Sequence, residues 1–146
     1  MADFSQVPWI AKHIALYKSD PEKAHYWDST PLGGPGVLPT LLLTTTGRNS
    51  GEPRALPLIY GNYGESYIIV ASKGGMPTHP LWFRNLEANP ACQAMVGAKA
   101  VTASARIAEG DEREKLWEQM AEIYAPYLEY AKATDRTIPV VVLDPS

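Results

Sequence analysis

The chain has 146 residues, 45% of them hydrophobic and 20% charged, with a formal net charge of −3. This composition excludes a disordered chain and predicts one globular domain over residues 1–146. The single cysteine excludes an internal disulfide framework, and no apolar run reaches the ~18 residues of a membrane span, so we expect a cytoplasmic protein. A pI of about 5.6 without a Lys/Arg cluster argues against a nucleic-acid partner.

Residues 1–37 are predicted to form a helix and a loop ahead of the main β-structure. Apolar residues at helical spacing predict a helix over 7–18, with Lys12, His13 and Lys18 elsewhere around it. This helix either packs on the rest of the fold, closes a cofactor groove, or touches the inner face of a membrane. The prolines and glycines between Ser19 and Pro39 predict an ordered loop.

Residues 38–72 are predicted to form three successive strands, at 38–46, 54–60 and 67–72. Apolar runs bounded by Gly, Pro, Asn and Ser are typical of antiparallel strands joined by short turns. A helix is expected to follow, through Ala88, with Thr78 or His79 as its cap and Pro80 in its first turn.

The second half of the chain alternates between strands and a long helix. A strand pair is expected at 91–96 and 100–107. A capping box of Asp111 and Glu114 predicts a helix from 112 to about 133, bent or broken just before Pro126. The final strand, 137–143, contains Pro139, which favours an edge or first-residue position. About six antiparallel strands with two or three flanking helices predict an α+β or mainly-β barrel.

One tight turn gathers residues that suit an anion. Arg48, Ser50, Gly51 and Arg54 supply two guanidinium groups, a hydroxyl and glycine-turn N–H groups, which fit phosphate or carboxylate. From spacing alone, an exposed hairpin with ordinary surface arginines is equally compatible. Between residues 41 and 84 four cations face only two acidic residues, which favours an anionic ligand.

A second glycine turn, Ser72-Lys73-Gly74-Gly75, follows an apolar strand. Glycine lets the backbone approach a flat ring or a phosphate closely, and Lys73 adds a cation, although such a sequence is often only a turn. The adjacent helix N-terminus at Pro80 also favours an anion. There Trp82 either borders a ring or packs in the core. The histidines have no metal-ligand spacing, so no metal site is expected.

Tyr124, Tyr127 and Tyr130 are predicted to lie near one face of the long helix. They either pack in the core or form an aromatic wall, in which a phenol donates a hydrogen bond to an oxygen that gains charge. The sequence shows no nucleophile with a base partner, which fits chemistry supplied by a cofactor.

The motifs TTTGRNSGEPR, IVASKGG and THPLW, in this order, resemble the deazaflavin (coenzyme F420)-dependent nitroreductase and quinone reductase family of actinobacteria. The resemblance extends from about Leu41 to the C-terminus. It implies the split β-barrel of flavin-binding reductases. It also implies hydride transfer from reduced F420 to a quinone, a nitroaromatic or an activated alkene such as an enone.

The resemblance also implies roles for individual residues. The expected cofactor-binding residues are Arg48, Asn49, Ser50, Arg54, Pro57, Ala71, Ser72, Lys73, Gly74, Gly75, Pro80 and Trp82. Ser72 and the three tyrosines are expected beside the acceptor. Asn49 stands where relatives often carry Lys or Arg, so anion binding relies more on Arg54. An FMN-dependent oxidoreductase on the same barrel and a non-catalytic deazaflavin- or flavin-binding protein are the alternatives, and the chain is expected to be a monomer or a homodimer.

Overall fold

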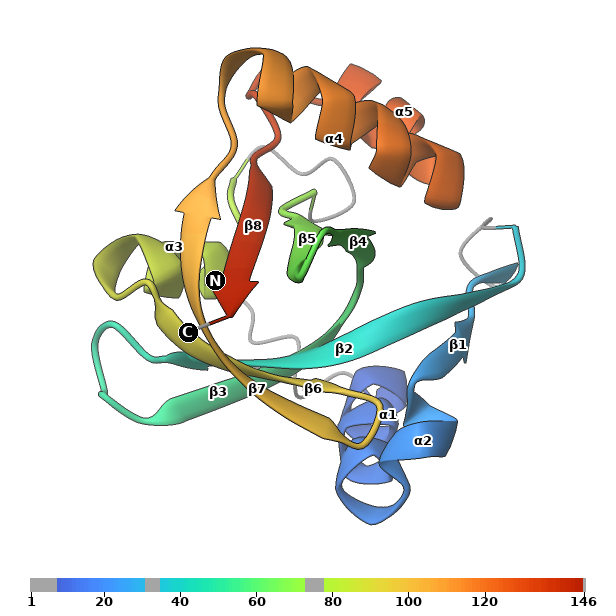
Figure 1. Cartoon of the computed structure of the whole chain (residues 1–146), viewed down its shortest axis with the longest axis vertical. Coiled ribbons are helices and arrows are strands. Elements are labelled where there is room, and N and C mark those ends of the chain that lie inside the picture. Colours follow the sequence, from blue (N-terminus) through green and yellow to red (C-terminus); the bar gives the residue numbers. More distant parts are fainter. Residues whose placement is uncertain (1–7, 31–34, 73–77, 146) are drawn as a thin grey trace.

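The strands form one antiparallel sheet that curls into a split β-barrel (Figure 1). This computed structural model describes residues 8–30, 35–72 and 78–145. The strands are β1 Tyr26–Asp28, β2 Val37–Thr46, β3 Pro53–Ile59, β4 Gly61–Tyr63, β5 Ser66–Val70, β6 Ala91–Val96, β7 Lys99–Ile107 and β8 Val140–Pro145. The helices are α1 Pro8–Ser19, α2 Pro21–Ala24, α3 Leu81–Ala88, α4 Gly110–Ile123 and α5 Pro126–Lys132. The predicted α+β barrel is confirmed.

The sheet has the order β1-β2-β6-β7-β8-β5-β4, and β3 pairs with β2 off this path. Each pairing is antiparallel, as the short connections predict. The six predicted strands are all present among the described residues. Two further strands of three residues, β1 and β4, extend the ends of the sheet.

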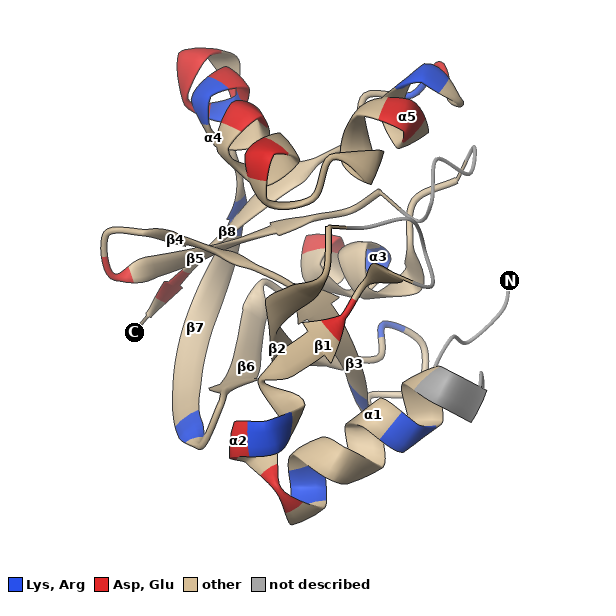
Figure 2. Ribbon diagram, turned by 90° about the vertical axis from the view of Figure 1, so that its right-hand side faces the viewer, with Lys and Arg blue, Asp and Glu red and all other residues tan. Residues whose placement is uncertain are grey.

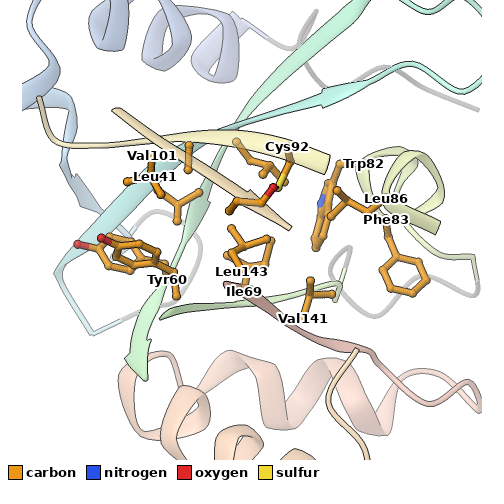
Figure 3. Packing of buried hydrophobic residues seen from close by; sticks show 14 of the residues in the cluster. Leu41, Tyr60, Ile69, Trp82, Phe83, Leu86, Cys92, Val101, Val141 and Leu143 are labelled. Carbon is orange, nitrogen blue, oxygen red and sulfur yellow. The ribbon is translucent and has the colours of Figure 1, made fainter. Parts of the chain in front are cut away.

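The inside of the barrel holds the first hydrophobic core. Side chains alternate across a strand, so Tyr67, Ile69 and Ala71 point into this core from the β5 side. Figure 3 shows Trp82 and Leu86 of α3 packed at one end of the core and Tyr60 at the other. Helix α3 covers the Trp82 end of the core and lies next to the turn that connects β2 and β3 (Figure 1).

The opposite face of β5 and β8 is covered by α4 and α5 (Figure 1). Ile68 and Val70 of β5 pack there with Leu116 and Met120 of α4, in a second core that we call the outer cluster. Two layers of apolar side chains therefore hold β5 and β8 between the barrel interior and the C-terminal helices.

The N-terminal helix packs on the barrel, as one of the alternatives predicts. Tyr17 is buried beside Leu42, and its hydroxyl donates to the Thr40 carbonyl. His13, predicted to lie away from the apolar face, is instead buried, with Nε2 2.8 Å from the Ala24 carbonyl oxygen. The lysines of α1 remain outside (Figure 2). No helix in the described part of the chain has the length and apolar character needed to cross a membrane.

The predicted loop over 19–39 is wrong in part. Pro21 opens the short helix α2, where the side chain of Asp20 accepts from the Lys23 N–H at 3.3 Å. The strand β1 then pairs with β2, which begins at Val37. A strand of three residues forms here because a long neighbour offers it backbone partners, which local composition does not reveal.

The helix predicted from 112 to 133 is two helices, because the chain breaks just before Pro126, as expected. The capping predictions are wrong. Helix α4 starts at Gly110 with Glu109 as N-cap, and α3 has Pro80 as N-cap; neither has a side-chain cap hydrogen bond. Pro139 lies just before β8, which has neighbours on both sides, so the edge position is also excluded.

The contact of β4 with α4 gives a stability prediction at Gly61. A Cβ there would lie 2.7 Å from Sδ of the fully buried Met120 and 3.2 Å from Cδ1 of Ile123. We expect Gly61→Ala to lower the free energy of unfolding by about 1–3 kcal/mol, as overpacking does. Urea titration measures this, with Asn62→Ala on the exposed face of the same strand as control. An unchanged midpoint for Gly61→Ala would contradict this packing.

Candidate functional site

The turn between β2 and β3 has a tight backbone. The Gly47 N–H donates to the Glu52 carbonyl and the Gly51 N–H to the Gly47 carbonyl, both at 2.8 Å. Gly51 has φ +74°, a left-handed conformation that favours glycine. A Cβ on Gly47 would lie 2.7 Å from Ser50 Oγ. The two glycines therefore let the turn fold back and present its other side chains outward.

A pocket of about 360 Å³ lies between this turn, the start of β3 and α3. Its lining consists of Gly47, Arg48, Asn49, Ser50, Arg54, Ala55, Leu56, Leu81, Trp82 and Asn85. The structure thus brings together five of the residues predicted to bind a cofactor, although they are up to 34 positions apart in the chain, from Arg48 to Trp82. We call this site the turn pocket.

The polar side of the turn pocket is cationic. Arg48 and Arg54 are exposed, and neither pairs with a carboxylate among the residues that the structure describes. Ser50 Oγ accepts from the Glu52 N–H at 3.1 Å, which leaves its own proton available to a ligand. Two guanidinium groups and a hydroxyl above an apolar floor suit a ligand with an anionic end.

Asn85 supports the turn from below, and the sequence-based prediction missed it. Its buried Oδ1 accepts from both the backbone N–H and Nη1 of Arg48, each at 3.2 Å. Its Nδ2 donates to Thr45 Oγ1 at 3.1 Å. The available signal was a polar residue at helical spacing from Leu81 and Trp82, four and three positions after them in α3. Asn85 fixes Arg48 at the rim of the pocket.

Among the described residues, the other predicted cofactor-binding residues do not line the turn pocket. Pro57 lies within β3 opposite Leu42, and Pro80 is the buried N-cap of α3. Ala71 and Ser72 are buried at the end of β5. The predicted contacts of Lys73, Gly74 and Gly75 lie outside the described residues.

Arg136, in the segment between α5 and β8, is a second residue that the sequence-based prediction missed. Its guanidinium donates to the Ala71 carbonyl at 3.1 Å and to the Ser72 carbonyl at 2.7 Å. It also lies 3.1 Å from Nδ1 of His79, just ahead of α3. A lone arginine in a polar segment carries no sequence signal of this role.

The three tyrosines lie together, but not on one helix. Tyr124 is the C-cap of α4, and Tyr127 and Tyr130 belong to α5. The hydroxyls of Tyr124 and Tyr130 are 3.1 Å apart, and the Tyr124 and Tyr127 ring centroids are 4.9 Å apart. Burial raises the pKa of Tyr124 and of Tyr127, so both phenols stay protonated at neutral pH. They lie in the outer cluster and do not line the turn pocket.

This chain is similar to proteins of one family along nearly its whole length. A model of the F420H(2)-dependent quinone reductase family matches residues 30–145. An F420H(2)-dependent quinone reductase of Mycobacterium tuberculosis is 39% identical in an alignment 141 residues long, which covers 92% of this chain and 95% of that protein.

Two solved structures are also similar to this chain. An F420-H2 dependent reductase (FDR-A) is 44% identical, with a TM-score of 0.68, and the match covers 72% of this chain and 93% of that one. A protein described as a domain-swapped dimer is 37% identical, with a TM-score of 0.71 over 92% of this chain and 95% of its own. The chain belongs to the F420H2-dependent quinone reductase family.

Proposed function

We propose that the turn pocket binds the anionic end of coenzyme F420 and that the end of β5 and the tyrosines bring the coenzyme ring and a quinone together. As a member of its family, the protein is an F420H2-dependent oxidoreductase. The observation that carries the proposed site is the pair of arginines, Arg48 and Arg54, without carboxylate partners in the described part of the chain.

The residues of the turn pocket fit the coenzyme's phosphate and acidic tail. Asn85 holds Arg48 at the rim, and Arg54 lies opposite Thr45 in the β2–β3 pairing, on the other side of the turn. Ser50 and Asn49 add neutral polar groups between them. Since Asn49 carries no charge, the two arginines supply the charge-assisted contacts.

The ring of the coenzyme is proposed to extend from the turn pocket towards Ala71 and Ser72. Trp82 supports this path, because it lines the turn pocket and also packs in the barrel core with Ala71. Pro57, Pro80 and the segment Lys73, Gly74 and Gly75 remain predicted contacts of the coenzyme.

When bound, reduced F420 supplies the hydride, and the protein supplies position and hydrogen bonds. The phenol hydroxyls of Tyr124, Tyr127 and Tyr130 would donate to the acceptor oxygen as it gains negative charge. The alternation of β5, with Ile68 and Val70 in the outer cluster, would direct Ser72 to the same side, as a second donor. A carbonyl acceptor, the quinone, suits such donors, and nitroaromatics and enones present similar oxygens.

The direct test is anaerobic turnover. Purified protein is mixed with F420H2 and menadione, and the return of oxidised F420 absorbance is followed, with a nitroaromatic and an enone in parallel. We expect quinone-dependent oxidation of F420H2, absent with heat-denatured protein. If F420H2 is oxidised only at the uncatalysed rate with every acceptor, the protein is a non-catalytic coenzyme-binding protein. Turnover with reduced FMN but not with F420H2 would favour the FMN-dependent alternative.

We also propose a homodimer, supported by the relative that is described as a domain-swapped dimer. Light scattering after gel filtration should give twice the chain mass of 16.0 kDa. A mass equal to one chain would establish the monomer.

A further inference from the structure

The end of β5 has an unusual partner because β8 begins after a proline. The last register pair of the two strands is Val70 with Val140, and the Ala71 N–H then donates to the Pro139 carbonyl at 3.0 Å. In an antiparallel ladder such a pair normally exchanges two hydrogen bonds. Pro139 has no N–H to return, so the ladder itself leaves the Ala71 carbonyl without its donor.

Arg136 supplies that missing donor. Its Nη1 donates to the Ala71 carbonyl at 3.1 Å, and its Nη2 donates to the next carbonyl, Ser72, at 2.7 Å. Ala71 is fully buried and Ser72 is 9% exposed, so water is a poor substitute for these donors. The backbone at the end of β5 is therefore held by a side chain from the segment that follows α5.

The same guanidinium also reaches the segment ahead of α3. Nη1 lies 3.1 Å from Nδ1 of His79, and because arginine only donates, Nδ1 must accept and carry no proton. The His79 ring packs against Phe83 of α3, with ring centroids 4.8 Å apart. The planar guanidinium group of Arg136 thus joins three parts of the molecule: the end of β5, the segment just before α3, and the segment after α5.

We propose that Arg136 is a positioning residue that holds the coenzyme-ring wall, Ala71 and Ser72, in register with the tyrosine-bearing helix α5. This inference rests on the proposed function. The anionic end of the coenzyme is held elsewhere, in the turn pocket, so loss of Arg136 should disturb the alignment of ring and acceptor more than coenzyme affinity. Lysine cannot replace arginine here, since one ammonium does not reach two carbonyls and an imidazole in one plane.

His79 makes the contact with Arg136 sensitive to pH. Burial and the positive charges of Arg136 and Arg84 lower the pKa of His79 from its ordinary 6.5, and Glu87 opposes this. Protonation removes the acceptor and places two cations together. The contribution of this contact to stability is therefore complete above pH 6.5, the unfolded value, and is lost as the pH falls through the lower pKa of the folded state.

The test compares the wild type with Arg136→Met, Arg136→Lys and His79→Asn. Stopped-flow hydride transfer from F420H2 to menadione is measured between about pH 5 and 8, with the dissociation constant of oxidised F420 beside it. We expect Arg136→Met to slow hydride transfer about tenfold to hundredfold. The dissociation constant should change by less than about threefold, because the anionic contacts remain. Arg136→Lys should fall between Arg136→Met and the wild type.

His79→Asn separates positioning from simple stabilisation. Its amide oxygen stands in for Nδ1 without titrating, so the loss of rate that the wild type shows as the pH falls through the lowered pKa of His79 should disappear. An acid limb that persists in His79→Asn, or a wild-type rate in Arg136→Met, would overturn the proposal. If Arg136→Met does not fold, Arg136→Lys and His79→Asn decide the question by the same criteria.

Hydrogen exchange distinguishes this inference from the proposed function. In Arg136→Lys, amides in the peptide that ends at Ser72 should exchange faster than in the wild type, with β6 and β7 unchanged. If exchange is faster in Arg136→Lys but the wild type does not oxidise F420H2, the proposed function is refuted and the positioning contact stands. Normal turnover with unchanged exchange would refute the contact and keep the function.

Discussion

Replacing Arg48 and Arg54 together by alanine is expected to weaken F420 binding by about a hundredfold to ten-thousandfold. Each charge-assisted hydrogen bond contributes roughly 1.5–3 kcal/mol, or about tenfold to a hundredfold in affinity. The two side chains approach the turn pocket from opposite sides of one turn, and no hydrogen bond joins them in the described part of the chain, so their effects should nearly add. Fluorescence titration with oxidised F420 at low salt measures the loss.

The matched control is Arg84→Ala. Arg84 lies on α3 like Trp82, but it pairs with Glu87 at 3.1 Å and does not line the turn pocket. We expect Arg84→Ala to bind F420 like the wild type. Wild-type affinity in the double variant, or an equal loss in the control, would show that the turn pocket does not hold the anionic end.

Tyr127→Phe is expected to slow hydride transfer by about tenfold to a thousandfold, with F420 affinity unchanged. Removing one donor to a developing oxyanion typically costs at most about a thousandfold. Of the three tyrosines, Tyr127 has the available hydroxyl, since that hydroxyl has no hydrogen-bond partner among the described residues, whereas Tyr124 and Tyr130 bond to each other. Pre-steady-state measurement with F420H2 and menadione isolates this step.

The control for Tyr127→Phe is Tyr26→Phe, a tyrosine 60% exposed on β1. Because burial raises the pKa of Tyr127, the wild-type rate should show no loss from phenol ionisation up to about pH 10. Loss of coenzyme binding and rate together in Tyr127→Phe, with the fold intact, would contradict the separation of roles between the turn pocket and the tyrosines.

Patterns local in sequence predicted most of the fold. The strand pair β6–β7 and the break before Pro126 depend on neighbouring residues, so hydrophobic periodicity and proline chemistry suffice. The short strand β1 forms only because β2 offers it an edge, and α4 starts without the predicted capping box. Such features depend on distant partners that no local pattern records.

The residues of the site likewise divide into those that local sequence predicts and those that depend on distant partners. The sequence could predict that Arg48, Ser50 and Arg54 lie together, because one glycine-containing turn carries all three. Asn85 and Arg136 could not be predicted, since each acts on backbone or side chains more than 35 positions away, 37 for Asn85 with Arg48 and 65 for Arg136 with Ala71. The folded sheet brings these pairs together.

The most direct measurement is a fluorescence titration of the purified protein with oxidised F420 and, in parallel, with FMN. The proposed site predicts micromolar or tighter binding of F420, little binding of FMN, and loss of F420 affinity in the Arg48→Ala, Arg54→Ala double variant. Tight binding of FMN with little affinity for F420 would contradict the proposed site and assign the turn pocket to a flavin phosphate instead.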